Sequence, residues 1–332
     1  VEEAAESLRL DSPIYFVGCG TSLYAGVAGE YAFRDLADQL SFAREAFEFA
    51  EYLPPEVGKS SVIAISHSGS TGAVLTAVER AKQAGANVIG ITDDLDAPLV
   101  DVADFVIGSS LGLEPTLPKT RSYLSTLLRI YLLATEAGRR QGLDVQAFQE
   151  QLTQLPEFVD QVLSVVKAQT KDLAEAHASK NRIIVVGNGP QLATAKEGAL
   201  KLIESALVDS VAWELEEAGH GTWASTETGD LAIVLAMDGP GLKKAQRLLT
   251  AMKSIDVDTW LITDTNIAFK NVDDITRLPV QGTESILPVL TVLPLYTFTY
   301  FLALENDIHP DIMRLDDERY LKARTVLRSD DE

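Results

Sequence analysis

The sequence predicts an α/β protein with two similar domains, each a parallel β-sheet flanked by helices. Short apolar runs alternate with helical patterns along most of the chain, which is typical of parallel strands joined by crossover helices. Residues 183–205 also align with residues 14–36 without a gap. Three pairs of glycines coincide in that alignment: Gly18 with Gly187, Gly20 with Gly189 and Gly29 with Gly198. A repeat of this kind indicates that one α/β domain was duplicated.

The length and composition of the chain agree with two domains. With 332 residues, of which 46% are hydrophobic and 23% charged, the chain can form two separate hydrophobic cores. The two halves are expected to meet near Gly142 and Asp144. We therefore expect domain 1 to cover residues 1–143 and domain 2 to cover residues 144–332.

The first half contains apolar runs that predict buried strands, each followed by a helical pattern. Strands are expected at residues 14–17, near Phe42, and at residues 62–65, 88–91 and 105–107. Helices are expected after the first strand to about Leu40, around Phe47, after the strand that ends at residue 65, and from about Thr120 to Arg139. Pro54 and Pro55 mark a break between the second and third strands.

The second half begins with a helical pattern over residues 144–177, which Pro156 is expected to interrupt. A strand starting at Ile183 and its helix follow, and the strand starting at Leu231 aligns with the one starting at Val62. The halves differ in their polar turns. Residues 66–71 read SHSGST where the second half has LAMDGP, and residues 218–221 read AGHG where the first half has FAEY. The halves therefore complement each other, which favours one composite site.

The net charge and the number of cysteines exclude several classes of partner and of structure. A formal net charge of −21 argues against nucleic acid or an anionic membrane surface as the main partner. No apolar run is expected to reach membrane-spanning length, and no signal peptide is visible. Cys19 is the one cysteine, so no disulfide framework is expected, and a reducing, cytoplasmic location is favoured. Because Cys19 is flanked by glycines, we expect it to pack as a small hydrophobe.

The turn after the strand at residues 62–65 is rich in hydroxyl groups. Ser66, Ser68, Ser70 and Thr71 surround Gly69 at the carboxyl end of a buried strand and just before a helix. A single hydroxyl there would be explained by helix capping, but four clustered hydroxyls go beyond that. Ligands of parallel sheets bind outside the carboxyl ends of the strands, and helix N-termini attract phosphate. The turn therefore predicts a phosphate site, which Thr21 and Ser22 can extend from the equivalent end of the first strand.

The glycines around Cys19 do not predict a dinucleotide site. Gly18 and Gly20 match the first two glycines of the dinucleotide-binding pattern G-x-G-x-x-G. Ser22 and Leu23, however, stand where the third glycine should be. No acidic residue closes the second strand in the way expected of dinucleotide-binding domains, where it binds the ribose. We therefore expect no NAD, and no organic cofactor. The histidines and carboxylates also lack metal-ligand spacing, so no metal site is expected.

The second half carries groups suited to proton transfer. Glu197, Lys201 and Glu204 follow at i, i+4 and i+7, which places them on one helix face. That face can be read as a solvated surface with an intrahelical ion pair. The nearby Glu217 and His220 favour a catalytic interpretation, because His220 lies between two glycines and is expected to be an exposed imidazole.

Taken together, these motifs resemble the double sugar-isomerase (SIS) domain family. The resemblance rests on GCGTS, the S-x-S-G-x-T turn, the segment from Glu114 to Lys119-Thr120, EGALKLIE, and the E-x-x-HG loop around His220. The similar proteins are the isomerase half of glucosamine-6-phosphate synthase and stand-alone phosphosugar isomerases, deaminases and deglycases. The resemblance extends over nearly the whole chain and implies two flavodoxin-like domains in a homodimer with a shared active site.

The family's functional residues can be carried over to matching positions. The resemblance implies that the sugar phosphate is held by Thr21, Ser22, Ser66, His67, Ser68 and Thr71. Further substrate contacts are implied for Gly20, Glu114, Leu117 and Glu217. Glu204 matches the base that moves a proton between C1 and C2 of the open-chain sugar, Lys201 matches the lysine before it, and His220 matches the histidine that opens the ring.

Three positions depart from the family's pattern. His67 stands where the synthase often has Gln, and Ser70 stands where Glu often precedes the threonine of the turn. The family's tail lysine, which can form a Schiff base with the sugar, is expected at Ala323. Lys322 and Arg324 flank that position, and Lys322 is the substitute that we assign to this role.

The leading functional hypothesis is a phosphosugar isomerase of deaminating type that acts on a 6-phosphorylated amino sugar. The sugar phosphate would be its small-molecule partner. The first alternative is the isomerase domain of a glutamine–fructose-6-phosphate aminotransferase. A second alternative, from a different class, is a sugar-phosphate sensor without turnover. Glu204 and His220 argue against the sensor, whereas the displaced tail lysine favours it.

Overall fold

The computed structural model describes residues 1–180 and 182–328, which form two compact units. Unit 1 comprises Val1–Gln149 together with the residues from Arg314 onward, and unit 2 comprises Glu150–Met313. The sequence-based division after residue 143 assigns the C-terminal tail to domain 2, whereas the structure groups that tail with unit 1. Domain limits at residue 143 therefore stay a prediction, and each unit is described below by itself.

Unit 1 is built on a five-stranded sheet in which every pair of neighbouring strands is parallel. The order across the sheet is β2-β1-β3-β4-β5, which is the flavodoxin-like order. The strands are β1 (Ile14–Gly18), β2 (Ser41–Glu45), β3 (Ser61–Ile65), β4 (Asn87–Ile91) and β5 (Phe105–Ile107). All residues of β1 and β3 are buried, which agrees with a sheet covered on both faces.

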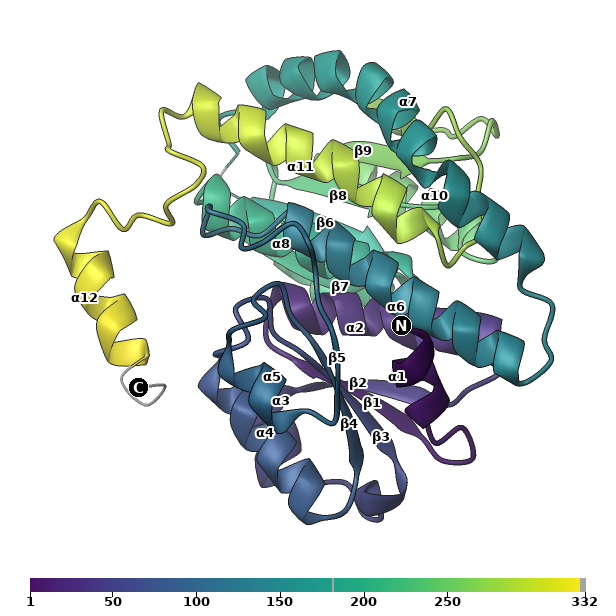
Figure 1. Ribbon diagram of the computed structural model, residues 1–332. Helices are drawn as coiled ribbons and strands as arrows, with labels where there is room; N and C mark the ends of the chain where they lie inside the picture. Colours follow the sequence, from purple (N-terminus) through teal and green to yellow (C-terminus); the bar gives the residue numbers. More distant parts are fainter. Residues whose placement is uncertain (181, 329–332) are drawn as a thin grey trace. The chain divides into compact units, whose positions relative to one another are not determined.

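Helices cover the sheet of unit 1 on both sides (Figure 1). They are α1 (Glu2–Ser7), α2 (Thr21–Ala37), α3 (Ala46–Glu51), α4 (Gly72–Gln83), α5 (Pro98–Val102) and α6 (Arg121–Arg140), with the 3₁₀ turn η1 (Val57–Lys59). Helices α2 and α6 lie on one side, where α2 approaches β1 closely. A Cβ added to Gly29 would lie 2.9 Å from the Phe16 ring and 3.1 Å from Ile130.

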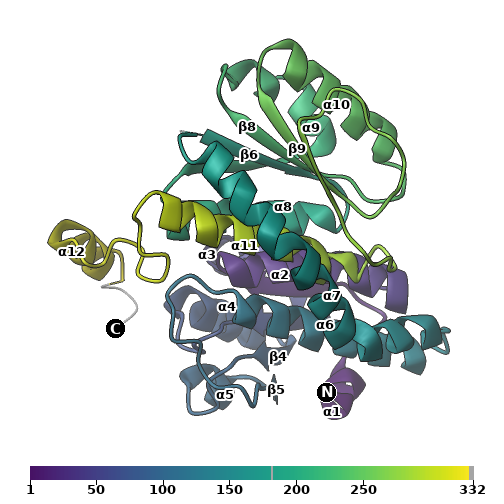
Figure 2. The ribbon, with the colours of Figure 1, turned by 90° about the horizontal axis from the view of Figure 1, so that it is seen from above.

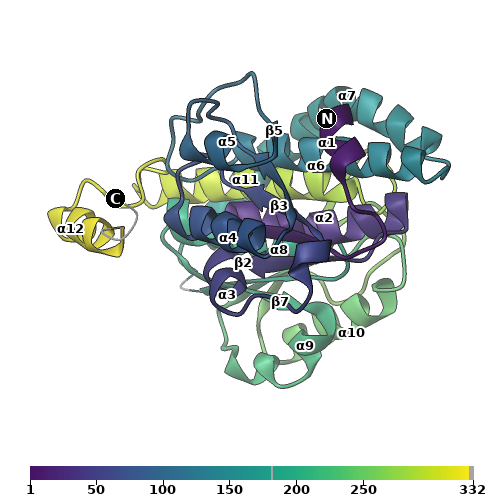
Figure 3. The same ribbon diagram turned by 60° about the horizontal axis from the view of Figure 1, so that its bottom comes forward.

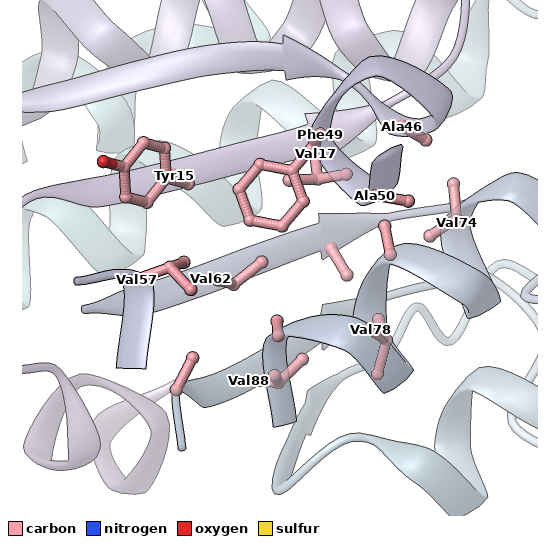
Figure 4. Close-up of a cluster of buried hydrophobic side chains, with 14 of the residues drawn as sticks. Tyr15, Val17, Ala46, Phe49, Ala50, Val57, Val62, Val74, Val78 and Val88 are labelled. Carbon is pink, nitrogen blue, oxygen red and sulfur yellow. The ribbon is translucent and has the colours of Figure 1, made fainter. Parts of the chain in front are cut away.

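The other side of the same sheet is packed by α3 and α4. Alternate residues of β1 and β3, with Tyr15 and Val62 among them, form one buried cluster with Phe49 of α3 and Val78 of α4 (Figure 4). The Tyr15 and Phe49 ring centroids are 5.6 Å apart. Because successive strand residues point to opposite faces, each strand contributes to the packing on both sides.

Unit 2 repeats this architecture. Its parallel sheet has the order β10-β9-β8-β6-β7, which is the order of unit 1 with each strand replaced by its counterpart. The strands are β6 (Arg182–Gly187), β7 (Asp209–Glu214), β8 (Leu231–Leu235), β9 (Asp258–Thr263) and β10 (Asp274–Arg277). The predicted fold class and the internal duplication are therefore confirmed.

The helices of unit 2 also form two layers. They are α7 (Gln146–His177), which starts just before the division, α8 (Gln191–Ser205), α9 (Leu215–Gly219), η2 (Thr222–Ser225), α10 (Leu242–Ser254) and α11 (Leu287–Glu305). Figure 2 shows α9 and α10 on one side of the strands and α8 and α11 on the other. Leu215 of α9 and Leu249 of α10 share a buried cluster with the strands.

Helix α11 is apolar on every side. By length and composition it could cross a membrane, so the expectation that no apolar run reaches spanning length was wrong. In the structure, however, 72% of its apolar window is buried inside the protein. Phe298 packs on Trp260 of β9 with ring centroids 5.0 Å apart, and Leu295 packs against Gly198 of α8. Burial on several sides explains the composition of this core helix.

Two other local expectations were also wrong. Pro156 does not interrupt the helical pattern, because α7 continues through it from Gln146 to His177. The proline is exposed, so the backbone oxygen that loses its helical donor at this turn can bind water instead. Cys19 is exposed rather than packed, because β1 ends at Gly18 and the chain leaves the core there.

Candidate functional site

The hydroxyl-rich turn connects β3 to α4 at the point where the strand order of unit 1 reverses. Strands β1 and β3 are neighbours and run parallel, so the ends of both strands meet at one edge of the sheet. Open α/β sheets bind ligands at such a reversal point. Gly69 has a φ of +63°, and a Cβ there would lie 2.5 Å from Ala97, so this turn requires glycine.

The hydroxyls of the turn bond to one another rather than to the helix. Ser66 Oγ lies 3.0 Å from Thr71 Oγ1, and Ser70 Oγ donates to Ser68 Oγ at 3.0 Å. Thr71 is the N-cap residue of α4, but its side chain makes no capping bond. Capping therefore does not account for this hydroxyl. The backbone N–H groups of Val74 and Leu75 donate to the Thr71 backbone oxygen, so an acceptor would meet the N–H groups that precede them in the first turn of α4.

The loop after β1 adds further groups at the same edge of the sheet. Gly20 has a φ of +53°, and Thr21 and Ser22 open α2 directly after it. Both hydroxyl residues are half-buried. The predicted phosphate residues of unit 1 thus lie at the ends of two adjacent strands.

His67 belongs to a buried charged cluster that also includes Asp93 and Arg129. Its Nδ1 lies 2.6 Å from Asp93 Oδ2, and Arg129 donates to Asp93 Oδ1 at 2.5 Å. The side chains of Asp93 and Arg129 are only 2% and 7% exposed. Arg129 also donates to the backbone oxygens of Thr92 and Ile107. We refer to His67, Asp93 and Arg129 below as the histidine cluster.

Electrostatics keep the carboxylate of this cluster ionised. Burial alone would raise the pKa of the Asp93 carboxyl, but the hydrogen bond from His67 and the charge of Arg129 hold that pKa below its ordinary value. Sequence reasoning missed Asp93 and Arg129 as partners of the turn. The available signals were a carboxylate directly after a strand and an arginine among the apolar residues of a helix.

Glu114 holds the start of α6 in the structure, and its contact with a substrate stays a prediction. Its carboxylate accepts hydrogen bonds from the backbone N–H and hydroxyl groups of both Thr120 and Ser122. The carboxylate therefore satisfies donors at the start of α6. Burial would raise its pKa, but the bonds from Ser122 and Thr120 lower it overall. Leu117 lies half-buried in the same segment.

We predict that Glu114→Gln destabilises the fold by about 2 kcal/mol at pH 7, because hydrogen bonds to a charged group contribute about 1.5–3 kcal/mol. The folded-state pKa of Glu114 is depressed, so its contribution is present above the ordinary value of 4.5 and is lost as the pH falls through the folded pKa. Urea unfolding between pH 7 and pH 3 measures this difference. The exposed Glu79→Gln change on α4 is the control. A constant difference at all pH values would contradict a role for the charged Glu114 carboxylate in holding the start of α6.

In unit 2, the residues Glu197, Lys201 and Glu204 come together on α8 as predicted, but the solvated-face interpretation was wrong. Glu197 is 0% and Lys201 1% exposed. Lys201 Nζ lies 3.6 Å from Glu197 Oε1 and is hydrogen-bonded to Glu204 Oε2. The Glu204 side chain remains 17% exposed, so this carboxylate can still reach a ligand. These three residues are called the α8 triad.

Helix α11 completes the surroundings of the triad. Tyr296 donates its hydroxyl hydrogen to Glu197 Oε1 at 2.9 Å. Burial would lower the pKa of Lys201, but the charges of Glu197 and Glu204 raise it overall, so the lysine stays cationic.

His220 lies at the end of α9 and is exposed, as predicted. Its Nδ1 lies 3.1 Å from the backbone oxygen of Glu216, and Glu216 is paired with Lys244 of α10. Glu217 is exposed, and its backbone oxygen accepts from Thr222. His220 also lines a pocket of about 550 Å³ between α9 and α10, which contains no residue of the α8 triad. The His220 loop and the triad do not share this pocket.

The tail lysine lies on α12 (Glu318–Leu327), the yellow helix of Figure 3. No residue of this helix is buried, and Lys322 is exposed. Among the described residues, no group of three or more His, Cys, Asp or Glu side chains is arranged to hold a metal ion. The assignments of all these residues to a substrate stay predictions.

The folds of the two units and the groups at their sheet edges define the class of this protein. Residues 8–136 match the family model of the SIS domain, so this part of the chain is a SIS domain. The expected resemblance is thereby confirmed.

Particular relatives make the similarity more specific. The chain is 30% identical over 322 residues to the glutamine–fructose-6-phosphate aminotransferase [isomerizing] of Clostridium tetani, covering 94% of this chain and 52% of that protein. The enzyme of the same name from Caldanaerobacter subterraneus is 29% identical, with coverages of 92% and 51%. The chain thus spans about half the length of the curated relatives it matches.

Solved structures share the fold over nearly the whole chain. The C-terminal domain of glucosamine-fructose-6-phosphate aminotransferase from Francisella tularensis superposes with a TM-score of 0.86 at 22% identity, covering 94% of this chain and 89% of that one. A glucosamine-6-phosphate deaminase from Thermotoga maritima has a TM-score of 0.72 at 24% identity, with coverages of 93% and 92%. At these identities the likeness concerns the fold.

Proposed function

We propose that this chain catalyses aldose–ketose isomerisation of a 6-phosphorylated sugar that is linked to amino-sugar metabolism. The observation that carries the proposal is the α8 triad, in which a buried lysine holds a partly exposed carboxylate. An isomerase of this kind needs a base that removes a proton from one sugar carbon and returns it to the next. Glu204 has the access and the fixed position for this role.

The other predicted residues have distinct tasks in this proposal. The hydroxyls of Ser66, Ser68 and Thr71, with Thr21 and Ser22, hold the phosphate. His220 assists opening of the sugar ring, and Lys322 is the candidate for a Schiff base with the open-chain carbonyl. None of these steps calls for an organic cofactor. The homodimer with a shared active site and the cytoplasmic location stay predictions.

The relatives help to choose between an isomerase and a deaminase. The curated relatives named above are aminotransferases that isomerise, and they align with more than nine-tenths of this chain. This similarity favours the isomerase part of such an enzyme over the deaminating enzyme that the sequence motifs suggested first. Both readings use the same proton transfer, so one set of assays separates them.

The decisive experiment follows proton exchange at the sugar. The protein is incubated with fructose 6-phosphate in D₂O, and NMR detects deuterium at C1 of fructose 6-phosphate or C2 of glucose 6-phosphate. We expect deuterium incorporation and interconversion of the two sugars. Ammonia release from glucosamine 6-phosphate in a parallel assay would favour the deaminase. Binding of both sugar phosphates without any exchange would contradict the proposal and favour the sensor.

The phosphate-binding role of the turn leads to a separate prediction. Thr71→Val removes one hydroxyl with little change in shape and should raise the Kd for fructose 6-phosphate about tenfold, since a hydrogen bond to a charged group contributes about 1.5–3 kcal/mol. Isothermal titration calorimetry measures this change. The matched control is Thr76→Val, which alters an exposed threonine further along α4. Equal affinities for the two variants would argue against a phosphate contact by Thr71.

A further inference from the structure

The histidine cluster has one ring nitrogen that the protein does not use. His67 Nδ1 is held by Asp93, whereas Nε2 is buried and has no hydrogen-bond partner within residues 1–180 and 182–328. Buried polar atoms are normally paired, so an unpartnered one needs an explanation. A group that arrives from outside, such as a ligand, is one explanation that can be tested.

The cluster and the hydroxyl turn form one structural element. His67 lies between Ser66 and Ser68, and its backbone oxygen accepts from Asp93 N at 3.1 Å and from Thr92 Oγ1 at 3.3 Å. The segment after β4 therefore holds both the backbone and the ring of His67. Any anion bound by Ser66 and Ser68 lies next to a residue whose ring orientation is fixed by Asp93.

The charge of the cluster depends on the protonation of the ring. The charged groups that face His67 are Asp93, from the segment after β4, and Arg129, from α6, which pairs with the same carboxylate. Asp93 and Arg129 balance each other, so a neutral His67 leaves the cluster without net charge. A protonated ring gives the cluster one net positive charge and makes Nε2 a hydrogen-bond donor. An anionic ligand therefore favours the protonated ring.

We propose that His67 takes up a proton when the turn binds a sugar phosphate, with Nε2 donating to the ligand and with Asp93 and Arg129 as positioning residues. The proton comes from solvent and remains on the ring. This inference rests on the phosphate site of the proposed function, and it makes affinity for the anion increase as the pH falls. Uptake of one proton corresponds to a change in affinity of about tenfold per pH unit.

Calorimetry can count the proton directly. Fructose 6-phosphate is titrated at pH 8, where its phosphate is already a dianion, in buffers with different enthalpies of ionisation. The dependence of the observed enthalpy on the buffer gives the number of protons taken up. We expect an uptake that approaches about one proton for the wild type. We expect none for His67→Gln, because the amide can donate a hydrogen bond but cannot titrate.

Control variants separate this proposal from the alternatives. His309→Gln alters an exposed histidine and should leave the proton uptake unchanged. His220→Asn removes the other histidine that is proposed to contact the sugar, and it should leave the proton uptake unchanged as well. If His67→Gln does not fold, the NMR titration of His67 in the wild type must move to higher pH with ligand. Binding without proton uptake, or with the same uptake in His67→Gln, would overturn this inference alone. Absence of binding by the wild type at any pH would overturn the phosphate site as well.

Discussion

Replacing Glu204 by Gln is expected to lower kcat for sugar isomerisation by about 10²–10⁴-fold, which is the usual contribution of a positioned acid or base. The amide keeps the shape of the side chain and can still contact Lys201, so the fold and the binding of the phosphate should change little. The measurement is deuterium exchange into fructose 6-phosphate together with the Kd of the same sugar.

A matched control for this variant is Glu305→Gln, which changes an exposed carboxylate at the end of α11. Its rate should equal that of the wild type. If Glu204→Gln retained the wild-type exchange rate, Glu204 would not be the base. A loss of binding without loss of turnover at saturation would point to a role in holding the sugar.

Replacing Lys201 by Met is expected to destabilise the protein by about 3–5 kcal/mol, since removing one partner leaves a buried charge without compensation. The affected charge is that of Glu197, which is fully buried, and Glu204 would then repel it. The pKa of Lys201 is raised in the folded state, so the wild type keeps this contribution below the ordinary lysine value of 10.5 and loses it as the pH rises through the folded pKa. Urea unfolding at pH 7 measures the loss.

The double variant Glu197→Gln, Lys201→Met tests the cause of that loss. Without the buried carboxylate, the loss of unfolding free energy should be clearly smaller than in Lys201→Met alone, because no uncompensated charge remains at position 197. The deficit of the single variant should also shrink as the pH falls and a carboxylate is protonated. Equal losses in the single and double variants would show that packing of the lysine stem, rather than its charge, is responsible.

The architecture could be predicted from the sequence because its signals are periodic and repeated. The apolar runs at Ile14 and Ile183 mark the same strand of two similar sheets, and the structure places both at the same position in the strand order. The hydroxyl turn was equally visible, since its residues are consecutive and follow a buried strand. A pattern that lies within one short segment can be recognised from the sequence without knowing the tertiary contacts.

The burial of the α8 triad could not be predicted from α8 alone. The spacing of its residues places them on one helix face, but whether that face meets water depends on α11, which lies far along the chain. Tyr296 illustrates this, because nothing near it in the sequence indicates a bond to Glu197. Asp93 and Arg129 were missed for the same reason.

Glu114 shows what a motif leaves open. The family resemblance implies a substrate contact for this residue, and in the structure its carboxylate accepts from residues at the start of the next helix. A motif records that a residue type recurs at a position. It does not distinguish a side chain that meets a ligand from one that holds the loop around it, and that distinction requires coordinates.

The apolar surface of α11 has a consequence for how unit 2 is made in the cell. Its five strands and α8 precede α11 in the chain, so they leave the ribosome before the helix that covers them has been synthesised. Until Leu287–Glu305 emerges, the groups that it covers, such as Trp260 of β9 and Glu197 of α8, lack this cover. Nascent chains of this length are therefore expected to be the species most prone to aggregation and most dependent on chaperones.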